Sequence, residues 1–520
     1  MKEKEVHVIL KSKRSGAMKK ESEVLSIIKD PTLTYYQQVL SLARLAENTD
    51  DSLPLDDDFL KALKDGCICT LNEGRSPYRP RYLVPDYEKF IREGSSFLGL
   101  EPPKDIFEAC NNLLIMYHNV PSITSFPVYL GNFTELLSPF DVDEDKTRKA
   151  IRLFLLNIDK TLTDSFVHAN IGPKDNRVTR IILELTEEMQ LAVPNLTLIY
   201  NEKNTPDELA YASIATMLKT SKPSFCNDAI YSEELGEGKY GIVSCYNAFR
   251  IGGGGYTLPR LKLHEIAMKA TDIDDFFIRV LPFYTHLILR NIDQRIRFIV
   301  EQSNFFKTNF LVKEGFLSRE KFVGMVGVVG LAECVNELLD IKDKNQGFGH
   351  SPKGEELGVK ILDALYDLVK KHKGYYCETY QNHYVLHAQV GIETDEESDS
   401  PGVRIPIGSE PELYKHLIFE GKMHRHFESG VGDIFKFDQT WNKSIPAILD
   451  IIQGAFKVGM RYFTAYNCDN DVVRVTGYLV KKSEIEKLEK NEPSMNQCTI
   501  LGKGSRDHGH SLSRRIYHKK

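Results

Sequence analysis

The 520-residue chain carries 67 Lys and Arg against 73 Asp and Glu, and this formal net charge of −6 argues against nucleic acid as the main partner. No apolar stretch approaches the about 20 residues that span a bilayer, and the charged N-terminus leads into no apolar signal segment, so we expect no membrane association. Nine cysteines without framework spacing are typical of a reducing compartment, so we expect a cytoplasmic protein.

The predicted elements begin with a mainly helical region and continue as short strands alternating with amphipathic helices, which is typical of an α/β protein. Residues 33–155 carry the helical pattern. Two long helices are predicted at residues 273–300, with a kink at Pro282, and at 358–373, with a C-terminal stop at Gly374. The β-type runs predict strands at residues 196–200, 241–246, 384–390, 461–466 and 472–480.

The last predicted strand, Asp471-Val-Val-Arg-Val-Thr-Gly-Tyr-Leu-Val480, is interrupted by Gly477. On spacing alone, such a glycine usually marks a bulge or a close backbone approach. Glycine also permits a different chemistry. Loss of a hydrogen atom from its Cα leaves a radical that the flanking amide nitrogen and carbonyl delocalise, and a residue without a side chain flattens freely.

The segment Arg474-Val-Thr-Gly-Tyr478 resembles the radical-bearing loop of glycyl radical enzymes, and its place near the C-terminus also fits. In those enzymes the stored radical passes to a cysteine on a facing loop, and the resulting thiyl radical abstracts hydrogen from the substrate. The segments Lys222-Pro-Ser-Phe-Cys-Asn-Asp-Ala-Ile230 and Gly241-Ile-Val-Ser-Cys-Tyr-Asn-Ala-Phe249 are similar to the stretch that contains this cysteine. The resemblance therefore assigns the thiyl role to Cys245, with Cys226 in a predicted preceding turn as its nearest rival.

Within that superfamily the chain looks most like the YjjI type. Arg79-Pro-Arg-Tyr-Leu-Val-Pro-Asp-Tyr87 and Tyr117-His-Asn-Val-Pro-Ser-Ile-Thr124 carry this resemblance. It implies a ten-stranded α/β barrel with surrounding helices, inside which the Gly477 and Cys245 loops meet. It also implies three regions, namely a mostly helical N-terminal region packed on the barrel (1–155), the barrel core with the cysteine loop (156–460) and a C-terminal glycyl radical domain (461–520).

The resemblance further implies a set of partners. A radical S-adenosylmethionine activating enzyme with an iron–sulfur cluster would generate the radical, and the protein would form a homodimer that acts on a small-molecule substrate. The cofactor of this chain would be the glycyl radical on Gly477 itself. The chain has no closely spaced three-cysteine run for a cluster, and we predict no bound metal.

The neighbours of Cys245 narrow the reaction. Pyruvate formate-lyases use two adjacent cysteines, whereas Ser244 precedes Cys245 here. Dehydratases and C–N lyases of the superfamily carry Cys-x-Glu, in which the carboxylate is a general base, whereas this chain has the neutral amide of Asn247. The reaction therefore stays open between a lyase or dehydratase type and a reductase type.

Four residues are candidates for binding the substrate or replacing the missing base. Asn247 is the first, since it occupies the position of the glutamate. His168 either lines the substrate cavity or is a hydrogen-bonded interior histidine. Glu265 is either that base or an exposed glutamate at a helix start. His424 is expected to share one face of a strand with His426.

Two alternative functions remain. The first is a ribonucleotide-reductase-like activity, because anaerobic ribonucleotide reductases also lack the glutamate and Gly252-Gly-Gly-Gly-Tyr-Thr-Leu-Pro-Arg260 is similar to their following loop. Those enzymes carry a four-cysteine zinc site, however, and only Cys468 and Cys498 lie near Gly477 here. The second alternative is a radical-incompetent barrel that binds a ligand or partner, and such a protein needs neither Gly477 nor Cys245.

Overall fold

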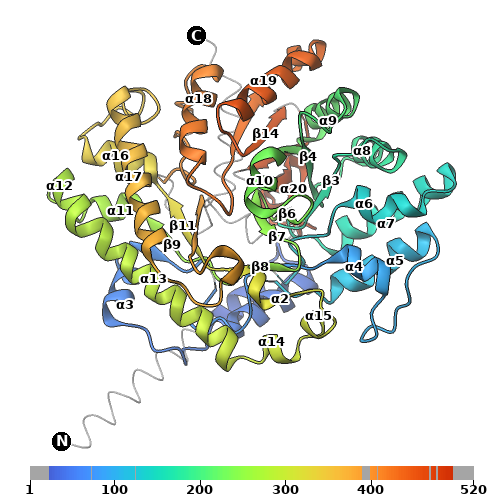
Figure 1. The fold of residues 1–520 in the computed structure, drawn as a ribbon, viewed down its shortest axis with the longest axis horizontal. Helices are drawn as coiled ribbons and strands as arrows, with labels where there is room; N and C mark the ends of the chain where they lie inside the picture. The colour runs from blue at the N-terminus through green and yellow to red at the C-terminus, as the bar shows by residue number, and fades with distance from the viewer. Residues whose placement is uncertain are drawn as a thin grey trace, which may run out of the picture.

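The computed structural model describes residues 23–71, 73–122, 125–388, 399–406, 408–467, 470–475 and 478–495. Most strands gather toward the centre of the molecule and helices surround them (Figure 1). The predicted α/β class is therefore confirmed. Among the described residues, the strands form separate sheets of five, four, three, two and two strands, and no closed ten-stranded sheet is found within this part of the chain.

Helices are the main regular structure of the N-terminal third. Its longer helices begin at side-chain caps: Asp105 accepts hydrogen bonds from the backbone N–H groups of Phe107 and Glu108, and Asp143 accepts one from Lys146. The helices of this part are α2 (Tyr35–Glu47), α3 (Asp57–Lys64), α4 (Tyr87–Glu93), α5 (Ile106–His118), α6 (Phe133–Leu137) and α7 (Glu144–Thr161).

The largest sheet has the order β13-β14-β5-β4-β3, and its strands are parallel except for the antiparallel β14–β5 pair. Every residue of β3, β4, β5 and β14 is buried, as expected for strands covered on both faces. The strands are β3 (His168–Ile171), β4 (Asn195–Tyr200), β5 (Ser224–Asn227), β13 (Asp433–Phe437) and β14 (Tyr462–Asn467). The helices packed around this sheet are α8 (Arg177–Met189), α9 (Asp207–Thr220), α18 (Leu413–His424) and α19 (Ile445–Lys457).

The smaller sheets complete the interior. The four-stranded sheet consists of β1 (Ile68–Cys69), β9 (Arg260–Lys262), β11 (Met325–Val329) and β12 (Val385–Ala388), in that order. The three-stranded sheet consists of β10 (Phe322–Val323), β8 (Gly253–Gly255) and β2 (Tyr82–Val84). The glycines of β8 are required by close packing, because a Cβ on Gly254 would lie 2.0 Å from the carbonyl oxygen of Tyr82.

Two hairpins are central to the candidate site. The first joins β6 (Tyr240–Val243) to β7 (Asn247–Arg250), and the second joins β15 (Val472–Val475) to β16 (Tyr478–Lys481). The predicted strand at 241–246 ends early because Ser244 adopts a positive φ of 58°. The predicted strand at 472–480 is a hairpin rather than one strand, since Val472 pairs with Lys481 and Val475 with Tyr478.

The two long predicted helices are present with different ends. The run at 273–300 is divided into α12 (Ile273–Asp275), a π-helical turn, α13 (Leu281–Arg297) and a second π-helical turn. Pro282 lies in the first turn of α13, directly after the π-helical turn that adapts the helix to it. The other helix, α17 (Pro352–Lys371), ends before His372 rather than at Gly374. Gly374 instead packs against the ring of Tyr384. A Cβ on Gly374 would lie 2.5 Å from a carbon of that ring.

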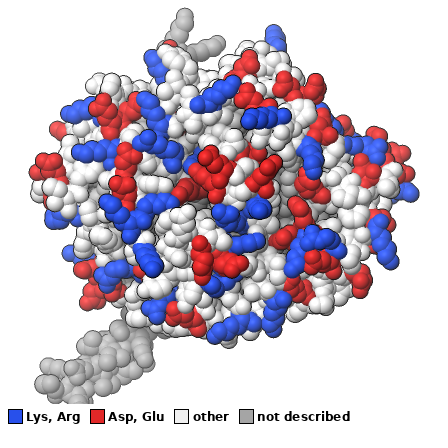
Figure 2. Space-filling view, in the orientation of Figure 1, with Lys and Arg blue, Asp and Glu red and all other residues white. Residues whose placement is uncertain are grey.

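The remaining helices are α10 (Asp228–Leu235), α11 (Leu263–Ala267), α14 (Phe305–Thr308), α15 (Phe310–Lys313), α16 (Leu331–Leu338) and α20 (Lys482–Glu489). In the described part of the chain, none of the helices combines the length and the apolar character that crossing a bilayer requires. On the face in Figure 2, basic and acidic side chains are interspersed, in line with the near balance of the two kinds of charge.

Candidate active site

Cys245 lies in the tight turn between β6 and β7, where the left-handed backbone of Ser244 reverses the chain. Its side chain is buried, and Sγ lies 3.8 Å from Oδ1 of Asn247, to which the thiol donates. Burial raises the pKa of the Cys245 thiol, against smaller opposing effects from the hydroxyl of Ser244 and the charge of Arg404. The thiol is therefore protonated at neutral pH, which is the form that gives up a hydrogen atom rather than the form that attacks as a thiolate.

Asn247 begins β7 and is fully buried beside the thiol. Its Oδ1 faces Cys245, while its Nδ2 makes no well-formed hydrogen bond among the described residues and lies beside the phenol of Tyr82. A buried donor left without a good acceptor costs about 1–3 kcal/mol, so this amide would gain from an oxygen that a bound substrate brings. The buried phenol of Tyr82 adjoins the same two residues, and burial is the main cause of its raised pKa. Sequence reasoning missed Tyr82, although it lies inside the quoted segment from Arg79 to Tyr87.

His168, at the start of β3, binds the backbone of the Cys245 turn. Its Nδ1 donates to the carbonyl of Ser244 at 2.6 Å, and its Nε2 lies 2.8 Å from Oγ1 of Thr197 on β4. Burial lowers the pKa of His168 to about 3, so the imidazole is neutral and Nε2 accepts the proton of the threonine hydroxyl. His168 is thus a hydrogen-bonded interior histidine, which was one of the two interpretations, and it orients the residue before Cys245.

Two strands near the C-terminal end, β14 and β15, also contact the Cys245 turn or the sheet beside it. The hydroxyl proton of Tyr462, on β14, is shared between the carbonyl of Cys245 at 3.0 Å and Oγ1 of Thr197 at 2.8 Å. Arg474, on β15, is buried and donates to the carbonyl of Ser221 at 2.9 Å and to Oγ of Ser224 at 2.8 Å. These contacts attach the hairpin to the central sheet. Gly477 itself, with residue 476, lies outside the described residues.

Glu265 and His424 lie apart from this turn. Glu265 is in the first turn of α11 and half-exposed, and its carbonyl accepts from Sγ of Cys67 at 3.9 Å. His424 is the last residue of α18, so the predicted strand at this position is wrong. Its Nε2 faces Glu420 one helical turn earlier, at 3.2 Å. Within the described residues, neither Glu265 nor His424 has a hydrogen bond or ion pair with the Cys245 turn.

The position of Cys226 also differs from the prediction. It lies in β5, between β4 and β14, rather than in a turn. Its Sγ is 3.6 Å from the hydroxyl of Tyr240, and burial raises its pKa to about 12. Pairing on both sides of this short segment, which local sequence does not reveal, makes it a strand. Cys226 is a core thiol of the sheet, whereas Cys245 lies on the turn.

Solved structures share this fold. The anaerobic ribonucleotide reductase of Thermotoga maritima in complex with dATP and CTP matches with a TM-score of 0.65 and 14% identity, covering 91% of this chain and 89% of that one. Hydroxyproline dehydratase of Clostridioides difficile matches with a TM-score of 0.62 and 12% identity, covering 94% of this chain and 88% of that one. Identities this low show the fold alone.

Sequence relatives define the family. A protein of Haemophilus influenzae, described as uncharacterized, is 44% identical over 503 residues, which are 96% of this chain and 98% of that protein. The uncharacterized protein YjjI of Escherichia coli K12 is 41% identical over 478 residues, 92% of each chain. The family model for glycyl radical enzymes of the YjjI-like type matches residues 33–517. The chain belongs to the YjjI-like family of glycyl radical enzymes, and the resemblance found in the sequence is confirmed.

Proposed function

We propose that this protein is an oxygen-sensitive glycyl radical enzyme that stores a backbone radical on Gly477 and uses Cys245 as a thiyl radical on a small polar substrate. The observation that carries the proposal is the buried, protonated thiol of Cys245 on a turn held by Tyr462. The chain continues from Tyr462 through β14 into the Arg474–Tyr478 motif. Family membership supports the radical chemistry.

The proposed radical transfer balances in hydrogen atoms. The Gly477 radical takes the hydrogen atom of the Cys245 S–H bond, so a Cα–H bond forms and the unpaired electron moves to sulfur. The thiyl radical then takes a hydrogen atom from a C–H bond of the substrate, which restores S–H and leaves a substrate radical. Ser244 cannot extend this relay as a second cysteine would, because its O–H bond is too strong.

Asn247 is the proposed substrate contact, since its buried Nδ2, which makes no well-formed hydrogen bond within the described residues, would donate to a substrate oxygen. A neutral amide takes no proton, so a dehydratase-type reaction would need its base from elsewhere. His168 is proposed to position the turn, because both of its nitrogens are already engaged. Roles for Glu265 and His424 at the substrate stay predictions, as does the choice between a lyase or dehydratase type and a reductase type.

Family membership supports a proposal for the wider assembly. We propose a barrel core (156–460), a helical N-terminal region (1–155) and a glycyl radical domain (461–520), with ten barrel strands in all. A radical S-adenosylmethionine enzyme that carries an iron–sulfur cluster is the proposed activating partner, in the cytoplasm, and the proposed assembly is a homodimer.

Electron paramagnetic resonance tests the proposal. After anaerobic activation with the activating enzyme and S-adenosylmethionine, the protein should show a doublet from the single hydrogen that remains on the Gly477 Cα. Gly477→Ala should abolish the signal, because a side chain disfavours the flat radical. A full signal from that variant would place the radical elsewhere and overturn the assignment.

A further inference from the structure

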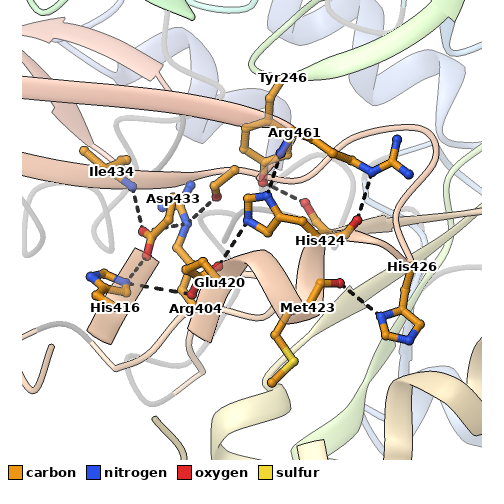
Figure 3. A network of polar contacts seen from close by, with 12 residues as sticks. Tyr246, Arg404, His416, Glu420, Met423, His424, His426, Asp433, Ile434 and Arg461 are labelled. Carbon is orange, nitrogen blue, oxygen red and sulfur yellow. Dashed lines mark hydrogen bonds and ion pairs between the residues drawn. The ribbon is translucent and has the colours of Figure 1, made fainter. Parts of the chain in front are cut away.

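A second group of buried polar side chains lies between α18 and the start of β13 (Figure 3). His416 and Glu420 lie one helical turn apart on α18 and face Asp433, the first residue of β13. One imidazole nitrogen and one oxygen from each carboxylate lie within 4.8 Å of one another. The exposed fractions of these three side chains are 5%, 0% and 9%, so this is an interior group rather than a solvated acidic surface.

The outer atoms of the two carboxylates are already occupied. Oδ1 of Asp433 accepts from the backbone N–H of Ile434 at 2.6 Å and lies 3.4 Å from Nε of Arg404. Oε2 of Glu420 lies 3.2 Å from Nε2 of His424. The inner atoms remain, namely Oδ2 of Asp433 and Oε1 of Glu420, at 2.6 Å and 3.8 Å from Nε2 of His416. Among the described residues, Oε1 of Glu420 is fully buried and has no hydrogen-bond partner.

The hydrogen bonds of His424 determine how Glu420 is oriented. Nδ1 of His424 accepts from the backbone N–H of Arg461 at 3.1 Å, so in the neutral imidazole the proton is on Nε2 and is donated to Glu420. Outer partners that orient a carboxylate in this way, with one oxygen held and the other left free, are characteristic of metal sites.

The balance of charges in the group also favours a bound cation. Glu420 and Asp433 bring two carboxylates, and Arg404 brings the permanent positive charge beside them. The guanidinium of Arg461 is committed to Glu234 at 2.6 Å. A buried carboxylate that is not compensated is very unfavourable, so the second one needs either a proton or a metal ion.

We propose that His416, Glu420 and Asp433 bind a divalent transition-metal ion of the Mn²⁺, Fe²⁺ or Zn²⁺ kind. One imidazole nitrogen with two carboxylate oxygens suits these ions, whereas Mg²⁺ prefers an all-oxygen set. On binding, a bond from Nε2 of His416 to the metal replaces its hydrogen bond to Asp433, and the protons on the ligands leave to solvent. The sequence-based expectation that no metal binds considers cysteine ligands. Cysteine spacing does not bear on a ligand set of one histidine and two carboxylates.

The proposed ion would lie close to the reactive turn. Asp433 follows Gly432, whose Cβ, if it had one, would be 3.1 Å from the ring of Tyr246, the neighbour of Cys245. The carbonyl of Gly432 accepts from Nε of Arg404 at 2.9 Å. A bound metal would therefore stabilise the segment that packs against this turn. The proposal is independent of the radical chemistry and is tested on protein that has not been activated.

The experiment uses the full-length chain, stripped of metal with a chelator and kept anaerobic. Mn²⁺ binding is followed by the loss of the resonance signal of the free ion, Zn²⁺ binding by calorimetry, and Mg²⁺ serves as the comparison ion. The wild type should bind Mn²⁺ at one site per chain, more tightly than Mg²⁺. Zn²⁺ titrations in two buffers of different ionisation enthalpy should show proton release on binding.

The variants locate the site. Glu420→Gln should weaken Mn²⁺ binding at least about tenfold, and His424→Ala should weaken it about 10–100-fold by freeing the orientation of Glu420. His426→Gln is the control, because His426 is equally buried just past α18 but pairs with Asp363 and lies apart from the group (Figure 3). Circular dichroism checks that each variant folds. No saturable Mn²⁺ or Zn²⁺ binding by the wild type, or equal binding by Glu420→Gln, would overturn the proposal and leave a proton as the compensating charge.

Discussion

Removal of the Tyr462 hydroxyl tests how strongly the C-terminal strands hold the Cys245 turn. In Tyr462→Phe, the carbonyl of Cys245 and Oγ1 of Thr197 both lose a buried partner, at 3.0 Å and 2.8 Å. Leaving one such group unsatisfied costs about 1–3 kcal/mol. An unfolding entropy of about 2.1 cal/mol/K per residue gives about 1.1 kcal/mol/K for this chain, so Tm should fall by about 1–3 °C.

Differential scanning calorimetry at a fixed scan rate measures this change. The matched control is Tyr231→Phe, because Tyr231 is also fully buried but its hydroxyl has no hydrogen-bond partner in the part of the chain that the structure describes. Removing that hydroxyl should leave Tm unchanged or raise it slightly. An equal loss of Tm in both variants would show that the cost is a general packing effect, and the proposed link between β14 and the turn would be refuted.

Three further predictions concern the radical and the buried histidines. Cys245→Ala should acquire the Gly477 radical to wild-type yield but should not catalyse deuterium exchange of a substrate, whereas Cys226→Ala should retain exchange; exchange by Cys245→Ala would refute its role. Air exposure of the activated protein should cleave the chain at Gly477 and release a fragment that begins near residue 478, and mass spectrometry of an intact chain after radical loss would contradict this. Because burial lowers the pKa of His168 to about 3, below the usual 6.5, the unfolded chain binds the proton first, and stability should fall as the pH drops from about 6.5 toward 3. This histidine contributes up to about 1.4 kcal/mol per pH unit, and His168→Gln should show a shallower decrease of Tm with falling pH, while an unchanged slope would contradict a neutral buried imidazole.

The elements that sequence predicts well are those whose pattern has one structural solution. The apolar runs that became β4 and β14 are buried on both faces, and their composition leaves little alternative. The run at 472–480 is different, because its β-type residues on both sides of Thr476 and Gly477 suit one continuous strand and a hairpin equally well. Only the pairing of β15 with β16 distinguishes a strand from a hairpin, and pairing is not local information.

The residues of the candidate site likewise differ in whether local sequence predicts them. Cys245 and Asn247 could be predicted because they stand two positions apart in one motif. Tyr462 was missed because its contact with Cys245 joins residues 217 positions apart in the chain, and no local signal accompanies it. The group around Glu420 lies between these cases. Its spacing from His416 is that of one helical turn, but the spacing is meaningful only once α18 is known to be a helix.

Arg474 gives the motif around Gly477 a structural role beside the proposed radical one. Its guanidinium donates to Asn195 on β4, to Ser224 on β5 and to the carbonyl of Ser221 just before β5, at 3.1, 2.8 and 2.9 Å. Burial lowers its pKa to about 10, so it keeps its charge at neutral pH and these hydrogen bonds are charge-assisted. The strand that contains Asn195 also contains Thr197, the partner of both His168 and Tyr462. Arg474, three positions before Gly477, therefore binds the same strand, β4, that supports the Cys245 turn. The motif that resembles a radical-bearing loop thus also contains the residue that holds its hairpin against the sheet.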